Sequence, residues 1–576
     1  MLKVFLKYIY NKKQGYSYVF VRPILPMLLA CVIGVLTYSF SNINLQGAVL
    51  IAASFLAVSI LFFSKQYIII SLLFFLISFF NSYFYYNLNV KSYKFFEVRV
   101  SSVSKTYGVG ELSSRKVKLD GLKDSVKPSE VIKVRGVFKK EKDIDRGIVG
   151  TLYIDEVLNI KEDYIFKLNN IRRLYFEKLK LILGEEDSAL VSSTTLGYTE
   201  ALTKEQNFDM GRLGIIHVVS VSGFHIALIF LILDRFLKLR YSIPISFVYV
   251  LITGATAPTI RAFFMILVLK FSKKVFKNYD GITALSFSAL LLILYKPYNA
   301  FDIGFMLSHL STLGIILMYK PFLRFLHKLP RRFNEGISVC LAAQTFSIPY
   351  LALTIKDFSI NFLIGNVLVL PIFTPLVVLG NIALLFMWND LIFSLICKVL
   401  YINMLVIKGA LKITEGISIP NIYLTNIFFY GYVFIIICFY MYKKGFEKFY
   451  KIAFGMMFTI LIISYGFFPK ITVYNEKRNR AIILERGFGK EMITVSKNEY
   501  FINKVKKQYA IYDVYKIKED YGVKIKDINI LIDKNTKKCY IKTSKNNDTK
   551  LIDCDIIGSD EKVIRIINGR IITSEF

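Results

Sequence analysis

The sequence predicts a polytopic α-helical membrane protein with a strand-rich domain after its first helices and a short strand-rich domain at its C-terminal end. Hydrophobic residues make up 54% of the 576 positions, and they occur in blocks suited to crossing a bilayer. Basic connections separate these blocks, and the formal net charge is +32. Apolar blocks alternating with basic connections are typical of multi-pass membrane proteins. The excess of positive charge also favours an anionic partner, either lipid headgroups or nucleic acid.

The first part of the chain, residues 1–86, is predicted to form the N-terminal transmembrane helices. A basic stretch over 1–22 precedes apolar segments near 25–41, 47–64 and 67–86. The positive-inside rule places the N-terminus in the cytoplasm, and three crossings place the residues that follow outside the cell. No small-residue cleavage site follows the first block, so we expect that block to remain as an anchor.

Residues 87–165 are predicted to form an extracellular β domain. Polar and apolar residues alternate with period two in four stretches, which indicates the short strands of a small barrel or sheet. Between residues 91 and 156, 15 Lys and Arg outnumber 10 Asp and Glu. The next stretch, 166–212, is predicted to be an amphipathic helical connector that lies on the membrane surface. The four alternating stretches are Glu97–Val100, Lys116–Leu119, Val131–Val137 and Thr151–Ile154.

A second membrane domain is predicted over residues 213–468. Its apolar runs are interrupted at two places, at Gly254 to Pro258 and at Pro371 with Pro375. Broken helices at membrane depth are tolerated where protein buries them or where they line a watery cavity, which favours a transporter or channel. The basic connections place residues 469–576 outside the cell as a short C-terminal domain. The predicted segments lie near 213–234, 242–256, 258–272, 282–295, 303–318, 337–353, 360–387, 391–411, 424–442 and 452–468.

The first of these segments carries a polar cluster that includes two of the four histidines. Ionisable groups inside a membrane segment are by default a functional-site hypothesis. If 214–228 is one helix, His217 and His225 lie about 12 Å apart along it and cannot bind one metal ion together. Alternatively, Gly223 breaks the helix and exposes backbone amides that suit an anion. These side chains either line a pathway or brace the bundle. The cluster is His217, Ser220, Ser222, Gly223 and His225.

Further polar residues enter the predicted segments beyond this cluster. Arg261 either contacts a phosphate or carboxylate inside the domain or extends to the membrane interface. Asp302 opens a segment as a helix N-cap, and it is followed by Ser308 and His309. His309 is structural unless it faces the two histidines of the polar cluster. The Asn366 amide either joins helices or contacts a substrate.

Several kinds of chemistry have no signature in this sequence. We find no nucleophile elbow, P-loop, kinase set or zinc motif. The sequence therefore predicts no catalytic residue, no cofactor and no metal site, and it argues against an ATP-driven pump built from this chain alone. Spacing does not decide whether Cys539 and Cys554 form a disulfide.

The stretch Gly214–His225 resembles the membrane signature of the ComEC family of competence proteins, the DNA-uptake channel of transformable bacteria. Further blocks agree with the family in order and spacing, so the resemblance covers about 195–390. The family carries an OB-like module outside the membrane, so the resemblance implies that residues 87–165 form an extracellular OB-like domain. The matching blocks are Leu196–Tyr198, Pro258–Ala262, Pro297 with Gly304–Ser308, and Pro349 with Asn366 and Pro371.

The resemblance implies transport of single-stranded DNA across the cytoplasmic (inner) membrane during natural transformation. Membrane lipids, an external DNA receptor and a cytoplasmic ATPase or helicase are the expected partners, and a homo-oligomer is left open. Many family members end in a metallo-β-lactamase-like nuclease domain, which needs a metal site rich in histidine and aspartate. Residues 328–576 contain no histidine. We therefore expect no such nuclease activity, and the chain is not predicted to be an enzyme.

Basic and aromatic side chains of the external domain are candidate DNA contacts, because cations bind phosphates and bases stack on aromatic rings. Two other functions stay open. One is transport of another small anionic solute. The second is a membrane-embedded hydrolase that uses Ser222 and His225, for which the sequence offers no clear orienting acid. The candidate DNA contacts are Lys105, Tyr107, Arg115, Lys116, Lys118, Lys133, Arg135, Phe138, Lys139, Lys140 and Tyr153.

Overall fold

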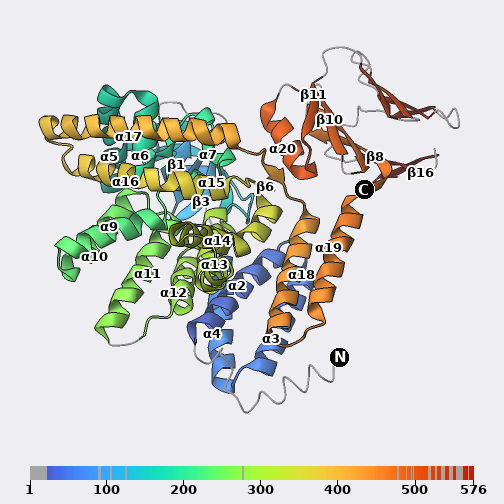
Figure 1. Cartoon of the computed structure of the whole chain (residues 1–576). Helices are drawn as coiled ribbons and strands as arrows, with labels where there is room; N and C mark the ends of the chain where they lie inside the picture. Colours follow the sequence, from blue (N-terminus) through green and yellow to red (C-terminus); the bar gives the residue numbers. More distant parts are fainter. Residues whose placement is uncertain are drawn as a thin grey trace. The chain divides into compact units, whose positions relative to one another are not determined.

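The computed structural model divides into two compact units (Figure 1). The first unit comprises Met1–Phe346 and Asn361–Ser418, and the second comprises Ser347–Ile360 and Ile419–Phe576. The structure describes residues 22–88, 93–103, 107–122, 126–275, 278–476, 479–487, 489–494, 496 and 498–516, and after these only the backbone of strands between 521 and 575.

Six helices of the described chain are long and apolar enough to cross a membrane, which confirms the predicted multi-pass character. They are α2 (Ile24–Ser41), α4 (Lys65–Tyr86), α13 (Ile303–Phe325), α14 (Arg331–Thr354), the continuous run Phe362–Leu385 that ends in α16 (Leu370–Leu385), and α17 (Asp390–Ile417). Shorter apolar helices are α3 (Leu45–Phe62), α10 (Leu239–Ile252), α12 (Gly281–Tyr295), α18 (Asn426–Lys443) and α19 (Phe449–Ser464).

The N-terminal helices α2 and α4 pack closely because a glycine lies between them. A Cβ on Gly34 would lie 2.5 Å from the backbone oxygen of Phe75, so only glycine allows this approach. Nearby, the Ser78 hydroxyl donates to the backbone oxygen of Cys31 at 2.9 Å, which satisfies a buried polar group. Together these contacts fix α2 against α4.

A closed barrel follows α4. Its strands are β1 (Tyr93–Val103), β2 (Gly108–Leu112), β3 (Arg115–Asp120), β4 (Val131–Lys139) and β5 (Ile148–Lys161). The order is β1-β2-β3-β5-β4, with β4 pairing antiparallel to β1 to close the barrel and β3 parallel to β5. The structure confirms the four alternating stretches as strands, since alternate side chains fill the barrel core.

Strand β2 was not among the alternating stretches, and its glycines explain why. Gly108 and Gly110 depress strand propensity, so the sequence Gly-Val-Gly-Glu-Leu reads as a turn. In the structure a Cβ on Gly110 would lie 2.7 Å from Cγ1 of Val98. The glycine is therefore needed where β1 and β2 approach each other inside a narrow barrel.

The predicted connector forms α5 (Tyr164–Leu183), α6 (Glu185–Leu196) and α7 (Lys204–Arg212). The expectation that this segment lies on the membrane surface is wrong for α6, whose residues from Asp187 to Leu196 are all buried. Its serine and threonine hydroxyls donate to carbonyls one turn earlier, as from Ser193 to Leu190 at 3.0 Å. Small side chains with satisfied hydroxyls let neighbouring helices pack against α6 on all sides.

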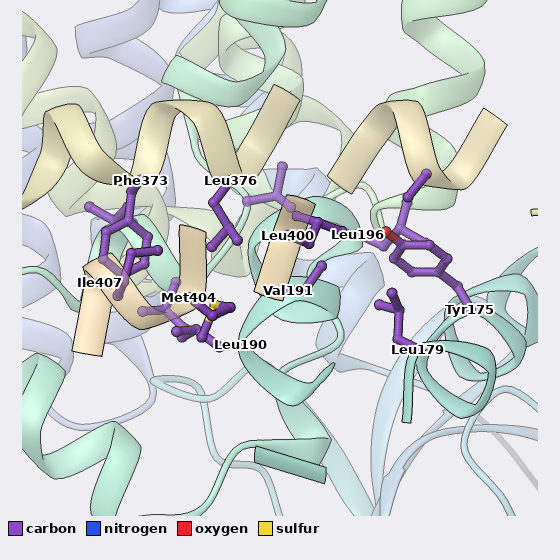
Figure 2. Packing of buried hydrophobic residues seen from close by; sticks show 14 of the residues in the cluster. Tyr175, Leu179, Leu190, Val191, Leu196, Phe373, Leu376, Leu400, Met404 and Ile407 are labelled. Carbon is purple, nitrogen blue, oxygen red and sulfur yellow. The ribbon is translucent and has the colours of Figure 1, made fainter. Parts of the chain in front are cut away.

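An extended core of the first unit includes residues of α5, α6, α16 and α17, which Figure 2 shows, and continues to α9 (Gly223–Phe236), α10 and α11 (Ala257–Lys274). At its centre the Tyr175 hydroxyl donates to the backbone oxygen of Gly380 at 2.8 Å, and the Tyr249 hydroxyl donates to that of Thr195 at 2.7 Å. These bonds tie α5 to α16 and α10 to α6. The labelled core residues in Figure 2 are Tyr175, Leu179, Leu190, Val191, Leu196, Phe373, Leu376, Leu400, Met404 and Ile407.

The second unit contains a sheet of order β11-β10-β9-β8-β16-β17, which confirms the strand-rich tail. Helix α20 (Glu499–Tyr509) connects β10 to β11, which run parallel. A separate sheet has the order β12-β13-β14-β15. Cys554 lies outside the described residues, so its pairing with Cys539 stays open. The strands are β8 (Gly466–Glu476), β9 (Asn479–Gly487), β10 (Gly489–Thr494), β11 (Asp513–Lys516), β12 (Tyr521–Ile525), β13 (Ile528–Ile532), β14 (Cys539–Thr543), β15 (Thr549–Ile552), β16 (Lys562–Ile567) and β17 (Arg570–Glu575).

Candidate functional site in the membrane domain

The segment with the polar cluster is broken into two helices. Helix α8 (Ile216–Val219) ends at Ser220, and α9 (Gly223–Phe236) begins after Ser222. The backbone of Ser220 and Ser222 is extended, with ψ near 146° and 177°. The interpretation of 214–228 as one helix is therefore wrong, whereas the predicted break at Gly223 is present. The break leaves the first-turn amides of α9 without intrahelical acceptors.

His217 lies on α8 and has an exposed side chain. The side chain of Asn366 hydrogen-bonds to it, which brings together residues of two separately predicted clusters. Asn366 belongs to a π-helical turn, Gly365–Val369, and its Nδ2 donates to the backbone oxygen of Phe362 at 2.7 Å. π-Helical turns inside longer helices are frequent at functional sites.

His225 is fully buried in the first turn of α9. Its Nδ1 accepts the backbone N–H of Ser222 at 3.1 Å and lies 3.0 Å from the Ser222 hydroxyl. Because Nδ1 accepts an N–H, the ring hydrogen of a neutral imidazole lies on Nε2. Among the described residues Nε2 has no hydrogen-bond partner, so no acid orients the ring as a catalytic base would require. This geometry is that of a helix cap.

Arg261 lies in the first turns of α11 (Ala257–Lys274) and points toward α9 and α13. Its Nη1 donates to the Thr312 hydroxyl and lies 3.7 Å from the sulfur of Met265. Thr312 in turn donates to the backbone oxygen of Ser308 at 2.8 Å. The Arg261 side chain is therefore held between α9 and α13. Thr312, which orients it, was missed because a threonine inside an apolar helix gives no distinctive sequence signal.

Gly223 and Arg261 belong to two predicted clusters, and the structure brings them into contact. A Cβ on Gly223 would lie 2.6 Å from Nη2 of Arg261. The glycine therefore leaves the space that the guanidinium occupies at the start of α9.

His309 is held by its own helix and a neighbour. Its Nδ1 donates to the backbone oxygen of Phe305 at 2.9 Å, and its Nε2 lies 3.3 Å from the Ser288 hydroxyl. Its ring also packs on Phe305, with centroids 4.1 Å apart. Asp302 caps the same helix by accepting the N–H of Phe305 at 2.7 Å. Both nitrogens of His309 are thus engaged within the bundle, which is a structural role.

On the barrel, two lysines lie over tyrosine rings of the barrel itself. Lys118 lies 5.1 Å from the ring centroid of Tyr107, and Lys139 lies 5.0 Å from that of Tyr153. Each pair combines a cation with an aromatic face, and Lys139 and Tyr107 are exposed. Other basic candidates have exposed or half-buried side chains, and they are Arg115, Lys133, Arg135 and Lys140.

Three barrel candidates do not fit this description. Lys116 lies 4.5 Å from the ring centroid of Tyr298, and burial lowers its pKa, so it faces the membrane helices rather than solvent. Phe138 is 6% exposed and belongs to the barrel core, so no base can stack on it from outside. Lys105 lies outside the described residues.

No group of three His, Cys, Asp or Glu side chains in the described part of the chain could hold a metal ion.

Comparisons with known proteins identify the membrane domain. A family model described as "Competence protein" matches residues 194–444. ComE operon protein 3 of Bacillus subtilis (strain 168) is 26% identical over 261 residues, which cover 42% of this chain and 33% of that protein. An uncharacterized protein of Aquifex aeolicus (strain VF5) is 30% identical over 216 residues, which cover 36% of this chain and 49% of that protein.

A third relative, an uncharacterized protein of Mycoplasma genitalium, is 28% identical over 167 residues, which cover 28% of this chain and 42% of that protein. The aligned regions thus span between a third and a half of the curated relatives. No solved structure matches the chain. The matched region contains the broken α8–α9 segment and Arg261.

Proposed function

Because this chain belongs, through residues 194–444, to the ComEC family of competence proteins, we propose that it transports single-stranded DNA across the cytoplasmic membrane during natural transformation. In this proposal the N-terminus is cytoplasmic, and the barrel and the C-terminal residues 469–576 are extracellular. The chain acts as a channel and not as an enzyme.

The observation that carries the proposal is the break between α8 and α9 inside the matched domain. A broken backbone at membrane depth is stable only where protein or a watery cavity satisfies its polar groups. His217 and Ser220 have exposed side chains at this break. Transporters bind polar substrates at such half-helix ends, and single-stranded DNA is a polar, charged substrate.

The barrel supports the same proposal as an OB-like module. Its strand order, with β4 closing on β1 and β3 parallel to β5, is compatible with a small Greek-key barrel of the OB type. The pairs Lys118–Tyr107 and Lys139–Tyr153 each offer a cation for a phosphate and a ring for a base. We propose that the barrel receives the DNA strand before it enters the membrane domain.

Energy and delivery must come from partners in this proposal. The sequence holds no P-loop, so a cytoplasmic ATPase or helicase would pull the strand and an external receptor would present it. Lipids surround the bundle, and a homo-oligomer is compatible with these roles. Residues 328–576 hold no histidine, so strand degradation is assigned to another protein.

Deletion and complementation test the proposal. Cells that lack the gene should bind labelled DNA at the surface but fail to convert it to a nuclease-protected form, and the intact gene should restore uptake. Unchanged transformation in the deletion strain would reject the proposal and favour the alternative, transport of a small anionic solute. Ion-flux measurements in proteoliposomes would then identify that solute.

A further inference from the structure

We propose that the first turn of α9 and the guanidinium of Arg261 form a phosphate-binding site inside the membrane domain. The site consists of the backbone amides of Gly223 and Phe224 and the Arg261 side chain. If the occupant is a DNA phosphate, the site rests on the proposed function and names its contact with the substrate. If the occupant is a lipid headgroup, the site is independent of that function.

The first argument is an uncompensated positive charge. Among the described residues Arg261 forms no ion pair, and its hydrogen-bond partners are the Thr312 hydroxyl and the Met265 sulfur. Its Nε is buried and has no hydrogen-bond partner. A guanidinium held among helices without a counter-ion is costly, and a bound anion removes that cost. A guanidinium whose Nε is unpartnered is suited to a phosphate.

The second argument is the helix end beside it. The first-turn amides of α9 lack intrahelical acceptors, and the helix dipole places partial positive charge at this end. Gly223 has no side chain to cover these amides. A Cβ built on Gly223 would lie 2.6 Å from Nη2 of Arg261, so the guanidinium lies directly beside this helix end. The N-terminus of α9 and the guanidinium therefore lie side by side, and a helix N-terminus is a common phosphate-binding feature.

The third argument is that the side-chain oxygen beside Arg261 is already engaged. Thr312 bonds both Arg261 and the Ser308 carbonyl. The guanidinium and the helix end thus offer donors to a ligand that accepts hydrogen bonds.

The site is also open to a ligand. Phe224, at the second position of α9, is 42% exposed, and Ser220 just before the helix is exposed as well. A phosphodiester, in DNA or in a phospholipid, has the required chemistry: it is anionic and accepts hydrogen bonds with all its free oxygens. These two sources differ in what the phosphate is attached to, which an experiment can separate.

The test uses the full-length protein in a non-ionic detergent. One probe is a fluorescent oligothymidine, whose binding is followed by anisotropy over a range of salt concentrations, and its uncharged methylphosphonate analogue is the control. The second probe is phosphatidylglycerol, whose retention on the protein is measured by mass spectrometry with diacylglycerol as the phosphate-free control.

Two variants remove the site in different ways. Arg261→Gln removes the positive charge. Gly223→Ala keeps the charge but displaces the guanidinium of Arg261. Because only the end of a flexible side chain has to move, we expect Gly223→Ala to preserve the fold. Gly409→Ala is the matched control, because a Cβ there meets nothing within 4 Å. Thermal unfolding reports whether each variant is folded, and Gly223→Ala carries the test if Arg261→Gln does not fold.

A DNA-phosphate site predicts about tenfold weaker oligothymidine binding in both variants, a salt slope smaller by about one, and no change with the methylphosphonate strand. Loss of phosphatidylglycerol retention alone supports the phosphate site with a lipid occupant. Unchanged binding of both probes to folded variants overturns the site. Transformation of the deletion strain is scored separately, so failure of the transport function leaves the lipid result interpretable.

Discussion

The Nζ of Lys296, just after α12, lies 2.6 Å from Oε1 of Glu111 on barrel strand β2. Around this ion pair the Tyr298 ring occupies the space next to Gly147, where a Cβ would lie 2.4 Å from the ring. The Tyr85 hydroxyl donates to the backbone oxygen of Gly147 at 3.1 Å. The barrel is therefore fixed to the membrane helices of its own unit by several buried contacts.

Removing the Tyr298 ring should loosen the barrel from these helices. Tyr298→Ala deletes buried contacts with Gly147 and with Lys116, so amide exchange in β2 and β3 should accelerate about tenfold. Hydrogen–deuterium exchange with mass spectrometry measures this. Phe325→Ala is the control, because Phe325 is 79% exposed. Equal exchange in the two variants would contradict the docking role of Tyr298.

The hydroxyl of Tyr175 should contribute measurably to the stability of the first unit. Tyr175→Phe removes the 2.8 Å donor to the backbone oxygen of Gly380, which keeps its donor within α16, so the loss should cost about 0.5–1.5 kcal/mol. Thermal unfolding in detergent measures the loss. Tyr164→Phe, at an 84% exposed position, should leave the unfolding temperature unchanged. A null effect of Tyr175→Phe would mean that water replaces the tyrosine donor.

Close packing between α13 and α14 depends on Gly314. A Cβ there would lie 2.1 Å from the backbone oxygen of Ala342, so Gly314→Ala must push the helices apart. We expect a loss of about 1–3 kcal/mol in unfolding free energy. Gly336→Ala, where the nearest atom would be 3.8 Å away, should be neutral or slightly stabilising. Unfolding temperatures of the two variants make the comparison, and equal values would argue against the close approach.

The junction between the barrel and α5 should be sensitive to acid. Arg99 lowers the pKa of Asp163, which also caps α5, from an ordinary value of 3.8 to about 2. A lowered pKa means that the ion pair stabilises the fold above pH 3.8, and that this contribution is lost as the pH falls through about 2. Asp163→Asn should remove this part of the pH dependence. Amide exchange in the first turn of α5 between pH 4 and 2 gives the readout, and an unaltered acid profile would exclude Asp163 as its source.

Lysines on the barrel should differ in their effect on DNA binding. Lys118→Gln and Lys139→Gln should each weaken binding of single-stranded DNA and lower the salt slope by about one, because each removes an open cation beside a tyrosine. Lys116→Gln is the matched control, since its side chain lies against Tyr298. Anisotropy titrations with purified protein compare the three. An equal loss in all three would indicate a purely long-range charge effect.

Apolar blocks predicted the helices well because hydrophobic length alone marks a membrane segment. The predicted segment 282–295 corresponds to α12, and 25–41 corresponds to α2, each within one residue at either end. The burial of helix α6 was not predicted, because its Ser and Thr residues are typical of a polar, exposed segment. Their hydroxyls bond to the helix's own carbonyls, and no local pattern reveals that other helices will surround it.

At the site, the sequence indicated the break at Gly223 and the unusual polarity of the segment. It did not predict that Arg261 contacts Gly223, or that His217 meets Asn366, because these contacts depend on how α9, α11 and the π-helical turn pack. Such contacts join residues far apart in the chain, and single-sequence patterns carry only local information. The burial of Phe138 was missed for the same reason.

The barrel and the C-terminal sheets differ in their susceptibility to pairing with other chains. The barrel closes on itself through β1 and β4, so within the described residues it presents no free strand edge. In the second unit, one sheet ends in β11 and β17, and the other ends in β12 and β15. Strand exchange between copies, or the start of aggregation in a crowded preparation, should therefore begin at these C-terminal sheets. Charged substitutions on their edge strands are the rational way to suppress it.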